Sequence, residues 1–389
     1  MKRHGGLWPL VTGWPNLEEA ARRAALGKRS RPDVAAFLLE RETHLAALRR
    51  ELLEGRYQPA GYRTFVIHEP KPRQISAAPF RDRVVHHALT QVLEPIFERR
   101  FSGASYACRV GKGTHAALAA ARGAARSYPY VLKCDVRKYF ASIDHAILVA
   151  ELQRVIRCGQ TVELARRIVE GSNEQETVAW YFPGDSLFTP AERRRGLPLG
   201  NQTSQFFANV YLNRFDHFVQ REIRPGAYLR YVDDFLLFAS TQNELKDAHG
   251  RIGEFLGDFR LRLHEGKSRI YRVRDGVTFL GWRIFPDRMR LVRQNVVRFR
   301  RRLAELLAGY AAGTTTREEV EQSVRAWIGH AQQGDTWRLR EQIFADNPLV
   351  GPPRLVISSE NFRAAAPPVK PSRASAFDVK GKGKRIKGI

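Results

Sequence analysis

The sequence predicts an α+β fold divided into two to three packed units, and three observations lead to that prediction. The chain has 389 residues, and at roughly 100–200 residues per domain this length gives two to three units. Short apolar segments of strand type alternate with longer segments in which apolar residues recur every three or four positions, the spacing of a helix. The segment 290–345 has a helical pattern throughout and is rich in basic residues, so we expect a separate small domain there.

The first half of the chain predicts helices around one hairpin and one buried strand. Leucines recur at near-helical spacing in 17–55, so we expect two helices there, the second ending at Gly55. The apolar segment Tyr130–Asp135 predicts a strand that ends in an acid, and Asp144 is expected to cap the next helix. The other elements expected in this half are a hairpin over 62–76, helices over 83–97, 115–126 and 145–155, and a glycine-rich loop over 103–113.

The second half predicts a further hairpin between amphipathic helices. A helix is expected after Gly200, because apolar residues recur there at i, i+3 and i+4 spacing. Residues 228–240 predict two strands around a tight turn at Val232, Asp233 and Asp234. The remaining expected elements are an irregular polar stretch over 171–196, a helix over 243–262, a strand over 276–285, the helices of 290–345 and a flexible basic tail over 366–389.

The charge of the chain indicates the class of its partner. Lys and Arg number 65 against 40 Asp and Glu, a formal net charge of +25. Nucleic acid rewards many Lys and Arg contacts through counterion release, so it is the expected partner; charge that serves only solubility is the alternative. No run of about 18 apolar residues occurs, so no membrane partner is expected. Three cysteines without a paired spacing favour a reducing cytoplasm over a disulfide or zinc framework.

Carboxylates at two expected strand ends are the first candidate site. Asp135 ends one strand, and Asp233 and Asp234 lie at the turn of the second hairpin. Carboxylates at the edge of a buried apolar sheet are costly unless a cation neutralises them. Mg²⁺ binds such oxygens, and a pair of these ions can clamp the attacking and leaving oxygens of a phosphoryl transfer. The alternative for Asp233 and Asp234 alone is an ordinary Asp-rich hairpin turn.

Several short motifs follow one another in an order that resembles a known family. Tyr231-Val-Asp-Asp234 resembles the YxDD box of reverse transcriptases, and Asp135 with Phe140 five residues later resembles their motif A. The other matching segments, from about residue 60 to 285, are Lys71-Pro-Arg73 and Arg81–Val85 (fingers motifs of the bacterial, group II intron-like branch), Leu197–Gly200 (motif B), His264–Ser268 (motif D) and Phe279–Gly281 (motif E).

This resemblance implies a right-hand polymerase fold, with fingers, a palm of antiparallel sheet and helices, and an all-helical thumb. The implied domains are a helical extension over 1–55 that packs on the fingers, the fingers and palm core over 56–285, the thumb over 286–348 and a basic flexible tail over 349–389. The tail is expected to be disordered; a non-specific RNA anchor is the alternative.

The resemblance also implies a two-metal nucleotidyl-transfer site. Asp135 and Asp233 would bind two Mg²⁺ ions, for which Mn²⁺ could substitute, with Asp234 assisting and the backbone carbonyl of Val136 as a further ligand. Lys267 would lie near the leaving pyrophosphate and act as a general acid. A plain surface lysine is the alternative for that residue.

Contacts with nucleotide, primer and template are implied as well. Lys71 and Arg73 would hold the triphosphate of a dNTP, unless they belong to a solvated basic turn. Phe140 would lie under the sugar and exclude a ribose 2′-OH, unless it is a core aromatic. The remaining implied contacts are Leu199, Gly200 and Gln205 with the nucleotide, and Phe279, Leu280 and Gly281 with the primer and template.

Motif B indicates a subgroup of reverse transcriptases. Most members carry Gln before the glycine of this motif and Ser-Pro after it, whereas here Leu199 replaces the Gln and Ser204-Gln205 replaces Ser-Pro. The stretch resembles the aliphatic-Gly-x-x-x-Ser-Gln hallmark of diversity-generating retroelement reverse transcriptases. Segments that are also similar to this group are Pro70–Arg73, Ser105–Arg109, Gly111–His115, Tyr139–His145 and Ala326–Ala331.

The subgroup implies copying of a template-repeat RNA into cDNA, with errors opposite adenines that diversify a target gene. Implied partners are the template RNA, dNTPs, the cDNA/RNA hybrid and an oligomeric accessory variability determinant protein. The implied location is the cytoplasm, for a protein encoded by a bacterium or a phage. Leu199 cannot hydrogen-bond the incoming nucleotide as a Gln can, and a loss of about 1.4 kcal/mol in discrimination lowers fidelity tenfold. Two alternatives remain open: a retron or phage-defence reverse transcriptase of ordinary fidelity, and a non-catalytic RNA-binding scaffold.

Overall fold

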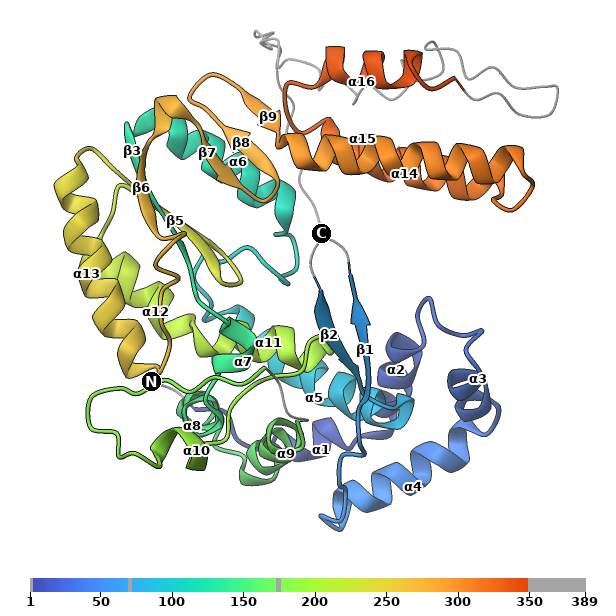
Figure 1. The fold of residues 1–389 in the computed structure, drawn as a ribbon. Coiled ribbons are helices and arrows are strands. Elements are labelled where there is room, and N and C mark those ends of the chain that lie inside the picture. Colours follow the sequence, from blue (N-terminus) through green and yellow to red (C-terminus); the bar gives the residue numbers. More distant parts are fainter. Residues whose placement is uncertain (1–2, 69–71, 173–175, 349–389) are drawn as a thin grey trace, which may run out of the picture. The chain divides into compact units, whose positions relative to one another are not determined.

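The computed structural model describes residues 3–68, 72–172 and 176–348. The chain forms two compact units, Met1–Val292 and Arg293–Ile389, and each is described by itself (Figure 1). Helices and antiparallel strands are both present, so the predicted α+β class is confirmed. Among the described helices, none has the length and apolarity that crossing a membrane requires.

Helices open the first unit and surround the long helix α5 (Phe80–Glu98). The prediction of two helices over 17–55 was wrong in number, because the chain turns at Gly27, with φ +66°, and leaves helical geometry again at Glu40. Pro32 lies at the start of the extra helix, where its missing N–H costs nothing. The helices of this region are α1 (Trp8–Val11), α2 (Trp14–Ala24), α3 (Pro32–Leu39) and α4 (Arg41–Leu53).

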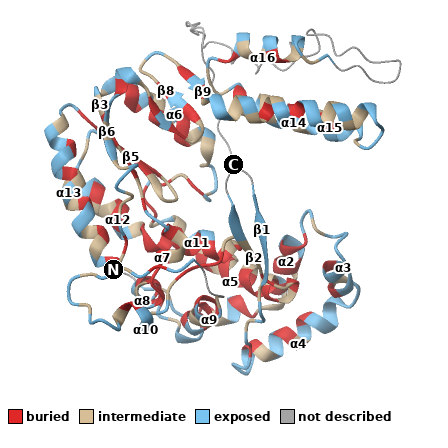
Figure 2. Cartoon of the chain, in the orientation of Figure 1, coloured by how far each residue is buried: buried red, intermediate tan, exposed pale blue. Residues whose placement is uncertain are grey.

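The predicted hairpin over 62–76 is confirmed as β1 (Arg63–Ile67) and β2 (Arg73–Ala77). The two strands are antiparallel, with Ile67 opposite Arg73. All five residues of β1 are exposed, so β1 and β2 form an isolated two-stranded sheet with little core beneath it (Figure 2).

A four-stranded antiparallel sheet in the order β4-β5-β3-β6 forms the centre of the first unit. Its strands are β3 (Tyr130–Asp135), β4 (Ala227–Tyr231), β5 (Asp234–Ala239) and β6 (Arg269–Arg272). Alternate side chains of β5 point to opposite faces, and Phe235, Leu236, Leu237 and Phe238 are all fully buried. Helix α13 (Gln242–Asp258) packs on β3, β5 and β6, and α6 (Thr114–Ser127) packs on β4 and β5.

The segment between β3 and β4 is helical in more places than predicted. Asp144 caps α8 (His145–Val155) by accepting a hydrogen bond from the Ile147 amide at 3.0 Å, as predicted. The predicted amphipathic helix after Gly200 is interrupted at Leu212. The further elements of this segment are α7 (Tyr139–Ser142), α9 (Gly159–Glu170), α10 (Thr189–Glu192), α11 (Gln202–Tyr211), α12 (Asn213–Phe218) and a π-helical turn (Val219–Ile223).

The single strand expected over 276–285 is a hairpin instead. Leu280 and Gly281 have φ of +47° and +83°, as in a two-residue turn with both central residues left-handed. The turn sequence Leu280-Gly281 lacks the Asn or Asp that usually marks such a turn. The apolar pattern over 276–285 therefore predicted one continuous strand. The strands β7 (Val277–Phe279), β8 (Trp282–Ile284) and β9 (Met289–Leu291) form a separate antiparallel sheet.

The second unit is all-helical in its described part, as predicted for 290–345. Phe299 and Trp327 stack at a centroid distance of 3.9 Å in its small core. A capping box at Thr316 and Glu319 fixes the start of the second helix. Its helices are α14 (Arg293–Ala311), α15 (Arg317–Ala331) and α16 (Trp337–Ala345). The tail expected over 349–389 lies outside the described residues.

Candidate functional site

Three aspartates lie at one edge of the central sheet. Asp135 at the end of β3 lies opposite Asp234, the first residue of β5. Tyr231 pairs with Asp234 across the β4–β5 turn, which leaves Val232 and Asp233 as its two central residues. The amide of the residue after Asp135 donates to the Asp233 carbonyl at 3.1 Å, which ties this turn to the end of β3.

The environment of these carboxylates opposes negative charge. Burial raises the pKa of Asp234 to about 7, Lys133 opposes that rise, and the Asp233 carboxylate adds to it. Burial, with a contribution from Asp135, also raises the pKa of Asp233. Lys267 Nζ lies 3.0 Å from Asp135 Oδ1, and Lys133 Nζ lies 3.6 Å from Asp234 Oδ2. Two lysines thus balance part of the negative charge.

The donor set fits divalent cations in its chemistry. Asp234 Oδ1 is buried without a hydrogen-bond partner, and a buried carboxylate oxygen needs a donor or a cation. Carboxylate oxygens are also the ligands that Mg²⁺ prefers. Within residues 3–68, 72–172 and 176–348, however, no three His, Cys, Asp or Glu side chains stand together as a ready-made metal site. The predicted ligands share one sheet edge, but Asp135 is paired with Lys267 and Asp234 with Lys133.

Two of the predicted cationic site residues are described: Arg73, predicted to bind the nucleotide, on β2, and Lys267, predicted to be catalytic, in the segment before β6. Arg73 is exposed at the start of β2, and its charge lowers the pKa of Asp233, so it acts electrostatically on the turn. Lys71 lies outside the described residues. Lys267 is held near Asp135 because the amide of His264 donates to the Asp135 carbonyl at 2.8 Å. Arg73 and Lys267 therefore both act on the carboxylate edge, whereas the predicted role of each stays a prediction.

Phe140, the last residue of motif A, is half-buried on α7. Its ring contacts that of Tyr139 edge-on at 5.6 Å and packs against the hydrophobic core. The Phe140 carbonyl accepts from the Leu197 amide at 2.8 Å, which joins motif A to motif B. Both interpretations of this ring, core aromatic and sugar contact, agree with a half-buried position.

Motif B holds the base of the β1–β2 hairpin. The Leu199 carbonyl accepts from the Ser76 amide at 2.9 Å, and Asn201 Nδ2 donates to the Ser76 carbonyl at 2.8 Å. Gly200 has φ +106°, and a Cβ there would lie 2.8 Å from Ile75 Cγ2, so only glycine fits without displacement. The role of Asn201 in holding the hairpin was not predicted from the sequence. A side-chain amide directly after the motif B glycine is the sequence feature that could have indicated it.

The remaining predicted contacts of motifs B and E differ in exposure. Gln205 is exposed on α11. Phe279 on β7 is fully buried, so its side chain belongs to the core, and any primer contact here falls to Leu280 and Gly281 in the turn. Those two turn residues are half-buried.

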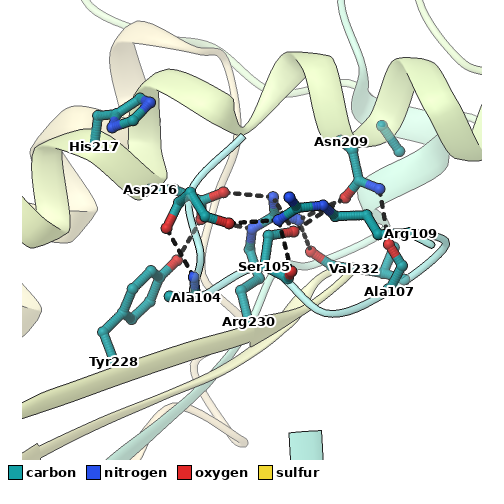
Figure 3. Close-up of polar contacts among 12 residues, drawn as sticks. Ala104, Ser105, Ala107, Arg109, Asn209, Asp216, His217, Tyr228, Arg230 and Val232 are labelled. Carbon is teal, nitrogen blue, oxygen red and sulfur yellow. Dashed lines mark hydrogen bonds and ion pairs between the residues drawn. The ribbon is translucent and has the colours of Figure 1, made fainter. Parts of the chain in front are cut away.

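A buried polar cluster beneath the β4–β5 turn was not anticipated (Figure 3). Arg230 on β4 and Asp216 on α12 form a fully buried ion pair with N···O distances of 2.7 Å. The strand Ala227–Tyr231 contains one arginine among mostly apolar residues. An arginine at a buried strand position is the signal that could have revealed this pair.

Comparison with known proteins gives the family. The reverse transcriptase (RNA-dependent DNA polymerase) family model matches residues 67–284, more than half of the chain. Protein YkfC of Escherichia coli K12 is 27% identical over 294 residues, which cover 65% of this chain and 74% of that protein. Nuclear intron maturase 2, mitochondrial, of Arabidopsis thaliana is 29% identical over 139 residues, which cover 32% of this chain and 19% of that protein.

Among solved structures, apo telomerase from Candida tropicalis aligns with a TM-score of 0.45 and 13% sequence identity. The alignment covers 60% of this chain and 55% of that chain. This chain therefore spans about three quarters of YkfC, but much smaller shares of the maturase and the telomerase.

The family match contains motifs A to E and the carboxylate edge. It agrees with the predicted enzyme class, an RNA-directed DNA polymerase. The chain belongs to the reverse transcriptase (RNA-dependent DNA polymerase) family.

Proposed function

We propose that this chain extends a DNA strand on an RNA template by nucleotidyl transfer at the carboxylate edge of the central sheet. The observation that carries the proposal is the placement of Asp135, Asp233 and Asp234 at one edge of the sheet, with Asp135 opposite Asp234 in register. A protein that only bound RNA would gain nothing from three partly buried carboxylates beside its phosphates.

Divalent cations complete the proposed site. Asp135 and Asp233 would hold two Mg²⁺ or Mn²⁺ ions, with help from Asp234 and the Val136 carbonyl. When bound, such ions stabilise negative charge on the attacking and leaving oxygens of a phosphoryl transfer. Lys267, now paired with Asp135, is near enough to the edge to protonate the leaving pyrophosphate.

Substrate contacts come from the exposed hairpin and from motif A. Arg73, together with Lys71, would bind the triphosphate of a dNTP, because guanidinium and ammonium groups bind phosphate through charge-assisted hydrogen bonds. The half-buried ring of Phe140 would exclude a ribose 2′-OH and so select dNTPs over rNTPs. The template RNA and the growing cDNA/RNA hybrid would be held by the basic surplus of the chain.

The test is primer extension on an RNA template by Asp233→Ala, with Asp247→Ala as the matched control. Asp247 is an exposed acid on α13, with 71% of its side chain accessible. We expect synthesis to fall at least about 1,000-fold in Asp233→Ala, since each metal supplies several kcal/mol of charge stabilisation, and to persist in the control. RNA binding is measured in parallel. Extension retained by Asp233→Ala would overturn the proposed mechanism, and RNA binding without extension by the unmodified chain would support the scaffold alternative.

At a finer level we propose that the enzyme is error-prone and belongs to a diversity-generating retroelement. The support is the stretch Leu199-Gly-x-x-x-Ser-Gln205 in motif B, which lacks the usual glutamine. Leu199 is half-buried and has no polar side-chain atom, and its backbone carbonyl already accepts from the Ser76 amide. The enzyme would copy a template-repeat RNA with errors at adenines, assisted by an accessory variability determinant protein.

Sequencing of cDNA made on a defined RNA template, with and without the neighbouring genes, tests the subgroup. Errors concentrated at template adenines are the expected result. Faithful cDNA would overturn the diversification role and favour a retron or phage-defence enzyme. Faithful cDNA made only on an intron transcript would favour a role like the one that the name of the intron maturase relative describes.

A further inference from the structure

The β4–β5 turn adopts a backbone conformation that its sequence does not favour. Val232 has φ +58°, a left-handed conformation that β-branched residues rarely adopt. Only Val232 and Asp233 separate the paired residues Tyr231 and Asp234, and a two-residue hairpin turn requires a positive φ at its first central position. Glycine would meet that requirement at no steric cost, so something else must hold valine there.

Arg230 supplies a hydrogen bond to this turn. Its Nη1 donates to the Val232 carbonyl at 2.8 Å. The guanidinium has five N–H donors, and each has an acceptor in a fully buried setting. The other four contacts are Nε to Asp216 Oδ1 at 2.7 Å, Nη2 to Asp216 Oδ2 at 2.7 Å, Nη2 to Ser105 Oγ at 3.1 Å and Nη1 to Asn209 Oδ1 at 3.3 Å.

The acceptors of Arg230 are themselves fixed. Asp216 also accepts from Tyr228 Oη at 2.7 Å, and Asn209 Nδ2 donates to the Ala107 carbonyl at 2.9 Å. The backbone of Arg230 donates to the Ala104 carbonyl at 2.8 Å and accepts from a neighbouring amide of the same loop at 2.9 Å. Figure 3 shows the guanidinium enclosed by these groups from α11, α12 and the 104–107 loop. The guanidinium therefore connects the turn to two helices and a loop of the core.

We propose that Arg230 is a positioning residue, which holds the Val232 carbonyl and thereby fixes the backbone that presents Asp233 to the divalent cations. The inference rests on the proposed function of Asp233. An ion pair that only stabilised the fold would need the contacts to Asp216 alone, and hydrophobic replacements often serve stability as well. The planar five-donor fork is needed because one group must satisfy Asp216 and the turn together, and lysine has three donors and no fork.

The test uses a lysine at 230 and a glycine at 232. In Arg230→Lys we expect kcat for primer extension to fall about 10- to 100-fold, because small displacements of catalytic groups have effects of that size, with the KM for dNTP within about threefold. Val232→Gly alone lowers kcat, since a freer turn is less well ordered. Added to Arg230→Lys, the same substitution raises kcat, because glycine adopts the turn conformation without the lost hydrogen bond. This reversal of sign is the expected signature of positioning.

Tyr228→Phe is the matched control. It removes a hydrogen bond to Asp216 but leaves the bond from Arg230 to the turn, so thermal stability should fall while kcat stays within about twofold. If Arg230→Lys does not fold, Ser105→Ala takes its place. Unlike Tyr228, Ser105 contacts the guanidinium itself, so its loss frees the orientation of the group that holds the turn, and we expect a smaller loss of kcat and the same rescue by Val232→Gly.

The outcomes separate this inference from the proposed function. If Val232→Gly lowers kcat by the same factor in both backgrounds, Arg230 is only structural and the inference is overturned, although an active parent chain still supports the proposed function. If the parent chain itself extends no primer with Mg²⁺ or Mn²⁺, both fail together.

Discussion

The β4–β5 and β1–β2 hairpins of the first unit both carry predicted site residues, and they differ in how the rest of the molecule holds them. The β4–β5 hairpin lies within the central sheet, and Phe235 to Phe238 of β5 are fully buried. The β1–β2 hairpin has no sheet neighbour, and Phe65, Val66 and Ile67 remain 48%, 50% and 39% exposed (Figure 2). The base of β2 is tied to motif B, because the Ser76 amide donates to the Leu199 carbonyl and Asn201 Nδ2 donates to the Ser76 carbonyl.

This difference suits the two tasks that we propose for the hairpins. Carboxylates that hold metal ions must keep fixed positions, and the core beneath β5 with the Arg230 cluster restrains the turn that bears Asp233. A cationic clamp for a substrate that enters and leaves benefits from an element with little buried surface, because such elements open at low free-energy cost. Arg73 near the far end of the β1–β2 hairpin is in such a place.

The first and largest prediction compares a phenylalanine from each hairpin. Phe235→Ala should lower the free energy of unfolding by about 3–5 kcal/mol, because it leaves a cavity in the core. The Phe235 ring that is removed lies 5.1 Å from the Phe215 ring, centroid to centroid. Phe65→Ala should change that free energy by less than about 0.5 kcal/mol, since nearly half of its surface is already exposed. Urea denaturation of both variants is the measurement. Equal losses of unfolding free energy in the two variants would show that Phe65 is buried in solution, and would contradict the difference between the two hairpins.

The comparison also explains which parts of the molecule were predictable. The strand Tyr130–Asp135 and the cap at Asp144 were predicted to the residue, because each depends on a local pattern. The placement of Asp135 near Asp233 and Asp234 was predictable, because each lies at the end of an apolar strand and such ends lie at the edge of a sheet. The Arg230–Asp216 pair was not, since charged residues are usually exposed and only the fold brings these two together. The hairpin at Leu280 was missed because its turn residues lack the usual composition.

The second prediction concerns Gly200, which lets motif B approach the base of the β1–β2 hairpin. Gly200→Ala should cost about 1–3 kcal/mol of stability, because alanine resists φ +106° and its Cβ would meet Ile75 Cγ2 at 2.8 Å. Gly61→Ala is the control, since nothing lies within 4 Å of a Cβ there. Thermal unfolding gives the stability, and hydrogen exchange of the Ser76 amide reports on the base of the hairpin. Unchanged exchange at Ser76 would contradict the idea that motif B holds it.

The third prediction tests the clamp on the exposed hairpin. Arg73→Ala should raise the KM for dNTP about tenfold, which corresponds to about 1.4 kcal/mol, and leave thermal stability unchanged. Arg63→Ala removes an exposed arginine from the opposite end of the same hairpin and should change neither quantity. Steady-state kinetics with one dNTP varied give both constants. A loss of kcat with an unchanged KM in Arg73→Ala would argue that Arg73 acts through Asp233, whose pKa it lowers, and not on the triphosphate.

The last and smallest prediction concerns fidelity. Leu199→Gln should lower the misincorporation rate severalfold, because an amide can hydrogen-bond the incoming nucleotide where an aliphatic side chain cannot. A severalfold change corresponds to less than about 1.4 kcal/mol of difference between the transition-state energies for correct and incorrect nucleotides. The hydrogen bond from Ser76 to the carbonyl of residue 199 involves only the backbone, so the hairpin base should keep its geometry. Leu199→Met is the control that keeps the side chain apolar and should keep the error rate. Sequencing of cDNA from all three proteins on one template gives the error spectra. An unchanged spectrum in Leu199→Gln would separate the motif B sequence from low fidelity, and the proposed diversification role would then lose its physical basis while the polymerase assignment would stand.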